Sequence, residues 1–237
     1  MKKLLFVFFT LASVCSYAQS ADAVIQKYAA NMGGLEAFNK ITSVKMTGTV
    51  SAQGMDLPVT TQILNGKGMR TDVEVMGNAI VNCYANGKGW KINPYAGAPE
   101  PTEVTGTELA DFKAQSNVAN PLMDYKARGH QVEFLGEENV DGTKAFKIKL
   151  TNKDDGKATT YFISIVDYTL LKTISSREMR GEEVEVETFF SDMKEFGGAK
   201  FFMTRVQKIE GEEFQSIRFD KLELNVPIDE KIFEMSK

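Results

Sequence analysis

Few residue patterns in the chain could carry out covalent chemistry. His130 is the only histidine among 237 residues, and no G-x-S-x-G nucleophile turn accompanies it. A serine–histidine pair is therefore not indicated, and His130, in a Gly-His-Gln turn, is interpreted as a solvated loop residue. The segment Ser191-Asp192-Met193-Lys194 matches S-x-x-K by its letters. That motif needs the start of a helix, whereas these residues end a predicted strand.

The remaining polar motifs indicate turns and strand ends. Asn65-Gly66-Lys67-Gly68 and Asn86-Gly87-Lys88-Gly89 lack the spacing and the following helix of a phosphate loop. Four acidic pairs fall at predicted strand ends or turns, where solvated charges are expected; they are Glu137-Glu138, Asp154-Asp155, Glu182-Glu183 and Glu212-Glu213. We therefore predict no catalytic residue, no cofactor and no enzyme activity.

The first eighteen residues resemble a secretory signal peptide. A basic start at Lys2 and Lys3 precedes the apolar run Leu4–Val14, and Ser16-Tyr17-Ala18 supplies a small-x-small cleavage site. The run is too short to span a bilayer. Cys15 raises the alternative of a lipid anchor, but Val14 is bulkier than the residue that usually precedes a lipidated cysteine. The expected mature chain is a single domain of residues 19–237 in the periplasm.

Charge and cysteine content exclude several classes of protein. Without Lys2 and Lys3 the formal charge falls from −4 to −6, and no basic cluster is present, so nucleic acid is a poor partner. No later segment approaches about 20 apolar residues, which a membrane-spanning helix needs. Only Cys83 remains after cleavage, so neither an internal disulfide nor a Cys/His metal site is expected.

The positions of the apolar residues predict one N-terminal helix followed by a long antiparallel meander. Residues 21–40 have helical spacing, with Asp22 as a possible N-cap and an interruption at Gly33-Gly34. After residue 43 the period changes to two, and Gly-containing turns recur every 10 to 15 residues or so. This pattern predicts about 11 strands, most with one face exposed to solvent.

Residues 93–120 interrupt the meander. Pro94, Pro99 and Pro101 make an extended approach, and residues 107–117 then predict a short helix with Thr107 as N-cap. Leu109 and Phe112 share one face of this helix. A short helix needs packing to be stable, so the segment is either a movable lid over the sheet or a permanently packed plug.

One apolar face of the sheet could bind a ligand. The chain has eleven methionines and sixteen phenylalanines, and methionine adapts to irregular apolar shapes, although an ordinary core uses both residues too. Period two assigns a set of side chains to the wall of a concave cavity, some of which would pack beneath the N-terminal helix. The wall residues are Val44, Met46, Val50, Val59, Ile63, Val73, Val75, Ile80, Tyr84, Trp90, Ile92, Phe146, Ile148, Phe162, Val184, Val186, Phe202 and Phe219.

Several segments resemble a known family. Tyr84-Ala85-Asn86-Gly87-Lys88-Gly89-Trp90-Lys91-Ile92-Asn93-Pro94 resembles a hairpin of the outer-membrane lipoprotein-sorting proteins, the family of the periplasmic carrier LolA. The N-terminal helix with Gly33-Gly34, Val140-Asp141-Gly142 and the closing Asn225-Val226-Pro227-Ile228-Asp229 are also similar to periplasmic relatives in that family.

The resemblance implies an α+β fold: a curved, incomplete antiparallel β-barrel whose concave side is covered by the N-terminal helix and the inserted helix. It also implies that the apolar concave side holds lipid or lipoprotein acyl chains, as in envelope lipid trafficking. The resemblance further implies a functional arginine in the basic turn before the third strand, for which Lys67 and Arg70 are the nearest candidates in this chain.

The implied partners are acyl chains, an inner-membrane lipoprotein-release transporter and an outer-membrane acceptor, and a monomer is expected. The alternative is a lipid-sensing or protein-interaction domain of the same fold, without transport, because a fold alone does not fix a task.

Overall fold

The computed structural model describes residues 20–179 and 182–235, so the predicted signal peptide lies outside the described residues. The strands of this part of the chain are β1 (Ser43–Ala52), β2 (Met55–Leu64), β3 (Gly68–Val75), β4 (Asn78–Ala85), β5 (Lys88–Asn93), β6 (Ala98–Val104), β7 (Gln131–Val140), β8 (Thr143–Thr151), β9 (Ala158–Ser164), β10 (Leu170–Met179), β11 (Glu182–Phe196), β12 (Ala199–Ile209) and β13 (Glu212–Leu224). The helices are α1 (Ala21–Asn31), α2 (Leu35–Asn39), α3 (Gly106–Gln115) and α4 (Tyr125–Arg128), with 3-10 helices η1 (Pro94–Ala96) and η2 (Glu230–Phe233).

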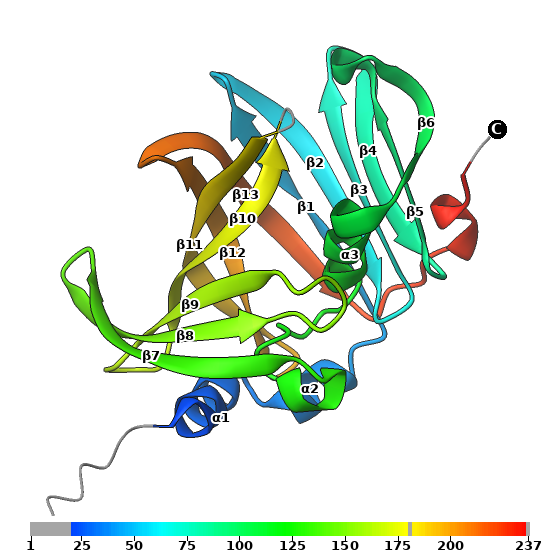
Figure 1. The fold of residues 1–237 in the computed structure, drawn as a ribbon. Coiled ribbons are helices and arrows are strands. Elements are labelled where there is room, and N and C mark those ends of the chain that lie inside the picture. The colour runs from blue at the N-terminus through cyan, green and yellow to red at the C-terminus, as the bar shows by residue number, and fades with distance from the viewer. Residues whose placement is uncertain (1–19, 180–181, 236–237) are drawn as a thin grey trace, which may run out of the picture.

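The described strands form one antiparallel sheet that curves without closing (Figure 1). Its 13 strands run in the order β6-β5-β4-β3-β2-β1-β13-β12-β11-β10-β9-β8-β7. The pairing of β1 with β13 joins the first six strands to the last seven. The predicted α+β, incomplete-barrel architecture is therefore confirmed, with two more strands than expected.

The N-terminal helix is divided as the glycines indicate. Ser20, rather than Asp22, is the N-cap of α1, because its hydroxyl oxygen accepts the backbone N–H of Ala23 at 3.2 Å. Gly33 and Gly34 separate α1 from α2, and both have positive φ. Val24, Ile25 and Tyr28 of α1 are buried in the main apolar core, which the helices share with one face of the sheet. We call this face the inner face.

The two additional strands arise from β6 and from the division of one predicted strand into β9 and β10. Pro99 and Pro101 lie in β6, which tolerates proline because it is an edge strand with only β5 as partner. The turn between β9 and β10 contains neither Gly nor Pro, so the sequence gives no sign that one strand ends and another begins there. Instead, the Ser164 hydroxyl accepts the N–H of Val166 at 3.2 Å, and Tyr168 adopts a φ of 58°.

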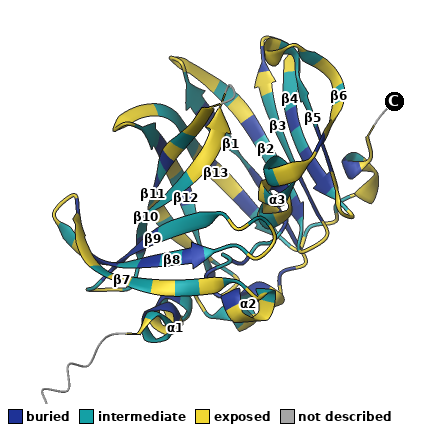
Figure 2. Ribbon diagram, in the orientation of Figure 1, coloured by how far each residue is buried: buried dark blue, intermediate teal, exposed yellow. Residues whose placement is uncertain are grey.

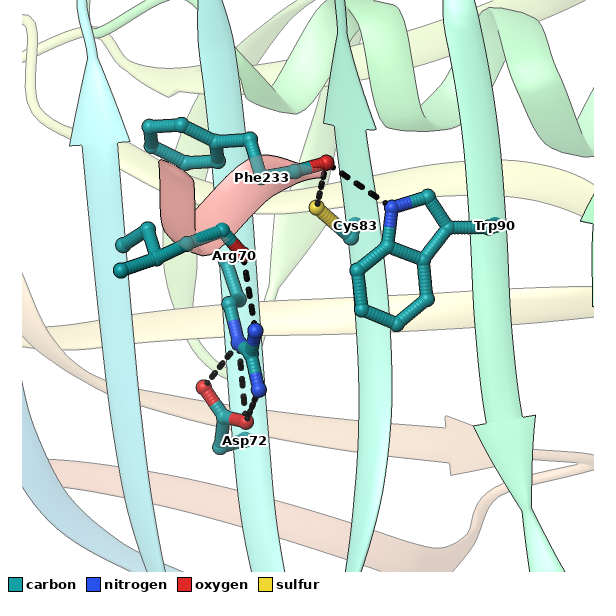
Figure 3. A network of polar contacts seen from close by, with 6 residues as sticks. Arg70, Asp72, Cys83, Trp90 and Phe233 are labelled. Carbon is teal, nitrogen blue, oxygen red and sulfur yellow. Dashed lines mark hydrogen bonds and ion pairs between the residues drawn. The ribbon is translucent and has the colours of Figure 1, made fainter. Parts of the chain in front are cut away.

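The C-terminal segment is fixed to the opposite, outer face of the sheet (Figure 3). The indole N–H of Trp90 donates to the carbonyl oxygen of Phe233 at 2.9 Å, and the thiol of Cys83 donates to the same oxygen at 3.5 Å. Arg70 donates to the carbonyl oxygen of Ile232 at 2.7 Å. These contacts, together with the buried Phe233 ring, hold η2 against β3, β4 and β5.

Cys83 offers a chemical test of this attachment. Burial raises the pKa of its thiol to about 12, so the reactive thiolate is scarce at neutral pH. We expect a Cys15→Ser protein to react with a thiol reagent at least about a hundredfold more slowly when folded than in denaturant. Trp90→Phe keeps a ring but loses the N–H to Phe233, and should label faster. Equal labelling of the folded and denatured protein would contradict the buried position of Cys83.

Candidate functional site

The inner face carries most of the predicted wall residues, but helices cover many of them. Nine are buried in the main core: Val44, Met46, Val50, Val59, Ile63, Tyr84, Phe146, Ile148 and Phe219. Val73 and Phe202 are half-buried against that core. Strand pairing places Ile80 beside Val73. Of the remaining inner-face members, Val75 and Val186 are buried and Val184 is half-buried. The buried members pack within the fold and are not accessible to a ligand.

Three predicted wall residues lie on the outer face. Cys83 pairs with Trp90 and Val81 with Ile92, so both β5 side chains join the cluster beneath η2. Phe146 of the inner face pairs with Ile163, which turns the neighbouring Phe162 outward into a third apolar cluster. Side chains directly opposite in a ladder share a face, so these three assignments are corrected by register.

Part of the inner face is only half-covered. We define the open inner face by its half-buried apolar side chains, which are Leu57, Val73, Ile80, Phe190, Phe202 and Ile217. Their partners place them: Val73 lies between Val59 and Ile80, and Ile217 lies opposite the core residue Val50. The Phe190 and Phe202 rings are 5.4 Å apart. Exposed residues lie at the strand ends away from α1 and α2, and also along β7 (Figure 2).

Helix α3 lies on the concave side of the sheet (Figure 1). Phe112 is buried and Leu109 half-buried, as predicted for the inserted helix, but the N-cap is Thr105 rather than Thr107. A side chain at Gly89 would lie 2.9 Å from a Leu109 methyl carbon, so the glycine lets α3 pack closely on β5. A recess of about 410 Å³ beside α3 is lined by Tyr84, Gly87, Gly106, Leu109, Ala110, Lys113 and Asp154.

Polar contacts tie both ends of α3 to the sheet. The Lys91 ammonium pairs with Glu108 at 2.7 Å, and Lys113 pairs with Asp154 at 2.5 Å. After the helix, the N–H of Val118 donates to the side-chain oxygen of Asn65 at 3.0 Å. All of these ion pairs are partly exposed and contribute little stability individually. The helix is therefore docked through contacts of which several are weak.

The two basic candidates differ in their surroundings. Lys67 is exposed in the β2–β3 turn, whose Gly66 N–H donates to the Ser116 carbonyl oxygen at the end of α3. Arg70 projects from the outer face, where its guanidinium pairs with Asp72 at 2.7 Å and lies 5.6 Å from the centre of the Trp90 ring. Arg70 is thus engaged in holding the C-terminal segment (Figure 3).

Two charged side chains near the open inner face were not predicted as site residues. Asp111 of α3 is exposed, yet surrounding protein desolvates its carboxyl group and raises its pKa against the opposing effect of Arg177 and Lys157. Arg205 of β12 is also exposed, and desolvation lowers its pKa. Each of these side chains is exposed to solvent and yet has a pKa shifted by desolvation. The two observations agree when protein surrounds a side chain on several sides but water still reaches it, as on a concave surface.

His130, the single histidine of the sequence, contacts the backbone of a neighbouring turn. The Nδ1 atom of His130 accepts the backbone N–H of Lys153 at 3.1 Å, and burial lowers the pKa of the ring. Within residues 20–179 and 182–235, no group of three or more His, Cys, Asp or Glu side chains could hold a metal ion. In the same ranges, no helix is long and apolar enough to cross a membrane.

Comparison with solved structures identifies the fold. A LolA superfamily protein of Nitrosomonas europaea superposes with a TM-score of 0.59 at 12% identity, over 92% of this chain and 98% of the other. A DUF1329 family protein of Desulfovibrio piger gives 0.59 at 13% identity, over 91% and 97%. A Vibrio parahaemolyticus domain described as outer membrane lipoprotein-sorting gives 0.56 at 12% identity, over 90% and 95%.

The chain therefore has a LolA-like fold, as its turn motifs suggested. No protein-family model matches the sequence, and no curated protein matches it.

Proposed function

We propose that the protein is a periplasmic carrier that holds lipid or lipoprotein acyl chains on the open inner face, without covalent chemistry. The observation that carries this proposal is the row of half-buried apolar side chains on the concave side, among them Val73, Ile80 and Ile217. Burying an acyl chain stabilises the complex by about 0.8 kcal/mol per methylene. The open inner face is suited to supply such burial.

Helix α3 acts as the cover in this proposal. Leu109 and Phe112 occupy apolar surface next to Tyr84, so an entering acyl chain would compete with them. The exposed Lys67, in the turn that contacts the end of α3, is the better candidate for a contact during transfer. Exchange with an inner-membrane release transporter and an outer-membrane acceptor belongs to the same proposal.

Uptake of a fluorescent fatty-acid analogue, together with native mass spectrometry of protein isolated from the periplasm, tests the proposal. We expect saturable uptake and co-purified lipid. A protein that is repeatedly isolated empty and takes up no analogue would rule out the carrier function. Isolation in a stable stoichiometric complex with another protein, without lipid, would instead favour the sensor function.

Weakening one anchor of α3 tests whether it moves. Glu108→Gln removes the charge that pairs with Lys91, and the loss of a partly exposed ion pair should speed analogue uptake about two- to threefold. Glu103→Gln, an exposed change on the neighbouring β6, is the matched control. Stopped-flow uptake rates that are the same for both variants and the unaltered protein would identify α3 as a fixed plug.

A further inference from the structure

Arg205 is the feature of the open inner face that the carrier function does not require. The strand register determines the face of the sheet on which the Arg205 side chain lies. Arg205 pairs with Ile217 of β13, and Ile217 pairs in turn with the core residue Val50 of β1. On its other side Arg205 pairs with Phe190 of β11. Side chains opposite one another in a ladder share a face, so the guanidinium is on the inner face between two apolar neighbours.

The guanidinium has no anionic partner among residues 20–179 and 182–235. Among the described residues, no carboxylate lies within ion-pair distance of Arg205, and its side chain makes no hydrogen bond. Most other described arginines of the sheet differ: Arg70 pairs with Asp72, and Arg218 pairs with Asp220. A cation among apolar groups is costly unless an anion accompanies it.

Polar side chains continue from Arg205 along the same face. Gln207, two residues further on β12, is buried and donates to the Thr188 hydroxyl at 3.5 Å. Gln207 also pairs with Gln215 of β13. The inner face therefore combines an apolar area with an accessible cation, Arg205, at the start of a short polar strip. This combination matches an amphiphile, whose chain is apolar and whose end is polar.

We propose that Arg205 binds the anionic headgroup of an acyl lipid, a carboxylate or a phosphate, whose chain lies on the open inner face. This inference rests on the proposed carrier function and narrows its ligand to anionic lipids. The planar guanidinium can donate two parallel hydrogen bonds to either oxyanion. Desolvation by the surrounding sheet, which already lowers the pKa of Arg205, strengthens such a pair relative to one in open water.

Binding of matched probes tests the headgroup. A fluorescent polyene fatty acid, its neutral methyl ester and a phosphate monoester of the same chain are titrated into the full mature protein. We expect both anionic probes to bind at least about tenfold more tightly than the ester. Arg205→Met should remove this preference and leave ester affinity unchanged, and Arg205→Lys should retain part of it. Preference for only one anionic probe would identify the headgroup as carboxylate or phosphate.

Arg218→Met is the control, because it removes the same charge from the neighbouring strand on the outer face. It should keep the full preference for anionic probes. Equal affinity of acid and ester for the unaltered protein, or unchanged acid affinity in Arg205→Met, would overturn the role of Arg205 and leave the carrier function intact. Failure of all three probes to bind would overturn both. Displacement of the acid by equimolar inorganic phosphate would show a free-anion site instead.

Discussion

Replacing Gly48 by alanine is expected to destabilise the protein by about 3 kcal/mol. A β-carbon at this position would lie 2.0 Å from the carbonyl oxygen of Arg218 and 2.6 Å from the α-carbon of Phe219. Both are backbone atoms of β13, so no side-chain rotation relieves the overlap. Gly48 sits where the β1–β13 register shifts, and this pairing joins the two halves of the sheet. Strand separation there would weaken the whole fold.

Urea unfolding followed by circular dichroism measures the effect. The control is Thr49→Ala on the same strand, a half-buried position whose change should cost less than about 1 kcal/mol. Gly48→Ala should unfold at clearly lower urea than this control. Coincident unfolding curves for the two variants would mean that β1 and β13 do not approach as closely as the structure places them.

In the β4–β5 hairpin, the strand register could be predicted from the turn residues alone. A two-residue turn at Asn86-Gly87 requires Ala85 to pair with Lys88, and hence Cys83 with Trp90. That pairing already separates Trp90 from Tyr84, which faces the core. The outward direction of Trp90 and Ile92 was therefore predictable from the turn, and assigning them to the same wall as Tyr84 was wrong for a local reason.

Other assignments depended on tertiary structure. The segment Tyr161-Phe162-Ile163 is buried throughout, so alternation gives no sign of which side chain faces inward. The run Phe201-Phe202-Met203 is apolar at every position, so it gives no alternation from which the face of the nearby Arg205 could be predicted. Which wall residues lie beneath helices, as Val44 and Phe146 do, is decided by helix docking and not by strand period.

Replacing Val73 by aspartate is expected to abolish acyl binding while the protein remains folded. Val73 lies on the inner face between Val59 and Ile80, and it is half-buried, so water can still reach a carboxylate there in the empty protein. A bound acyl chain would exclude that water and leave a charge without a partner, which costs several kcal/mol. Since each 1.4 kcal/mol is tenfold in affinity, the neutral ester probe should bind at least about a hundredfold more weakly.

Val73→Thr keeps the branched shape without a charge and should bind the ester within about tenfold of the unaltered protein. Circular dichroism and the unfolding midpoint separate loss of binding from loss of structure. Should Val73→Asp fail to fold, Ile80→Asp introduces the charge from β4, directly opposite Val73, and tests the same surface. Undiminished ester binding by a folded aspartate variant at either position would place the acyl chain away from the open inner face, because a desolvated carboxylate there could not be accommodated without cost.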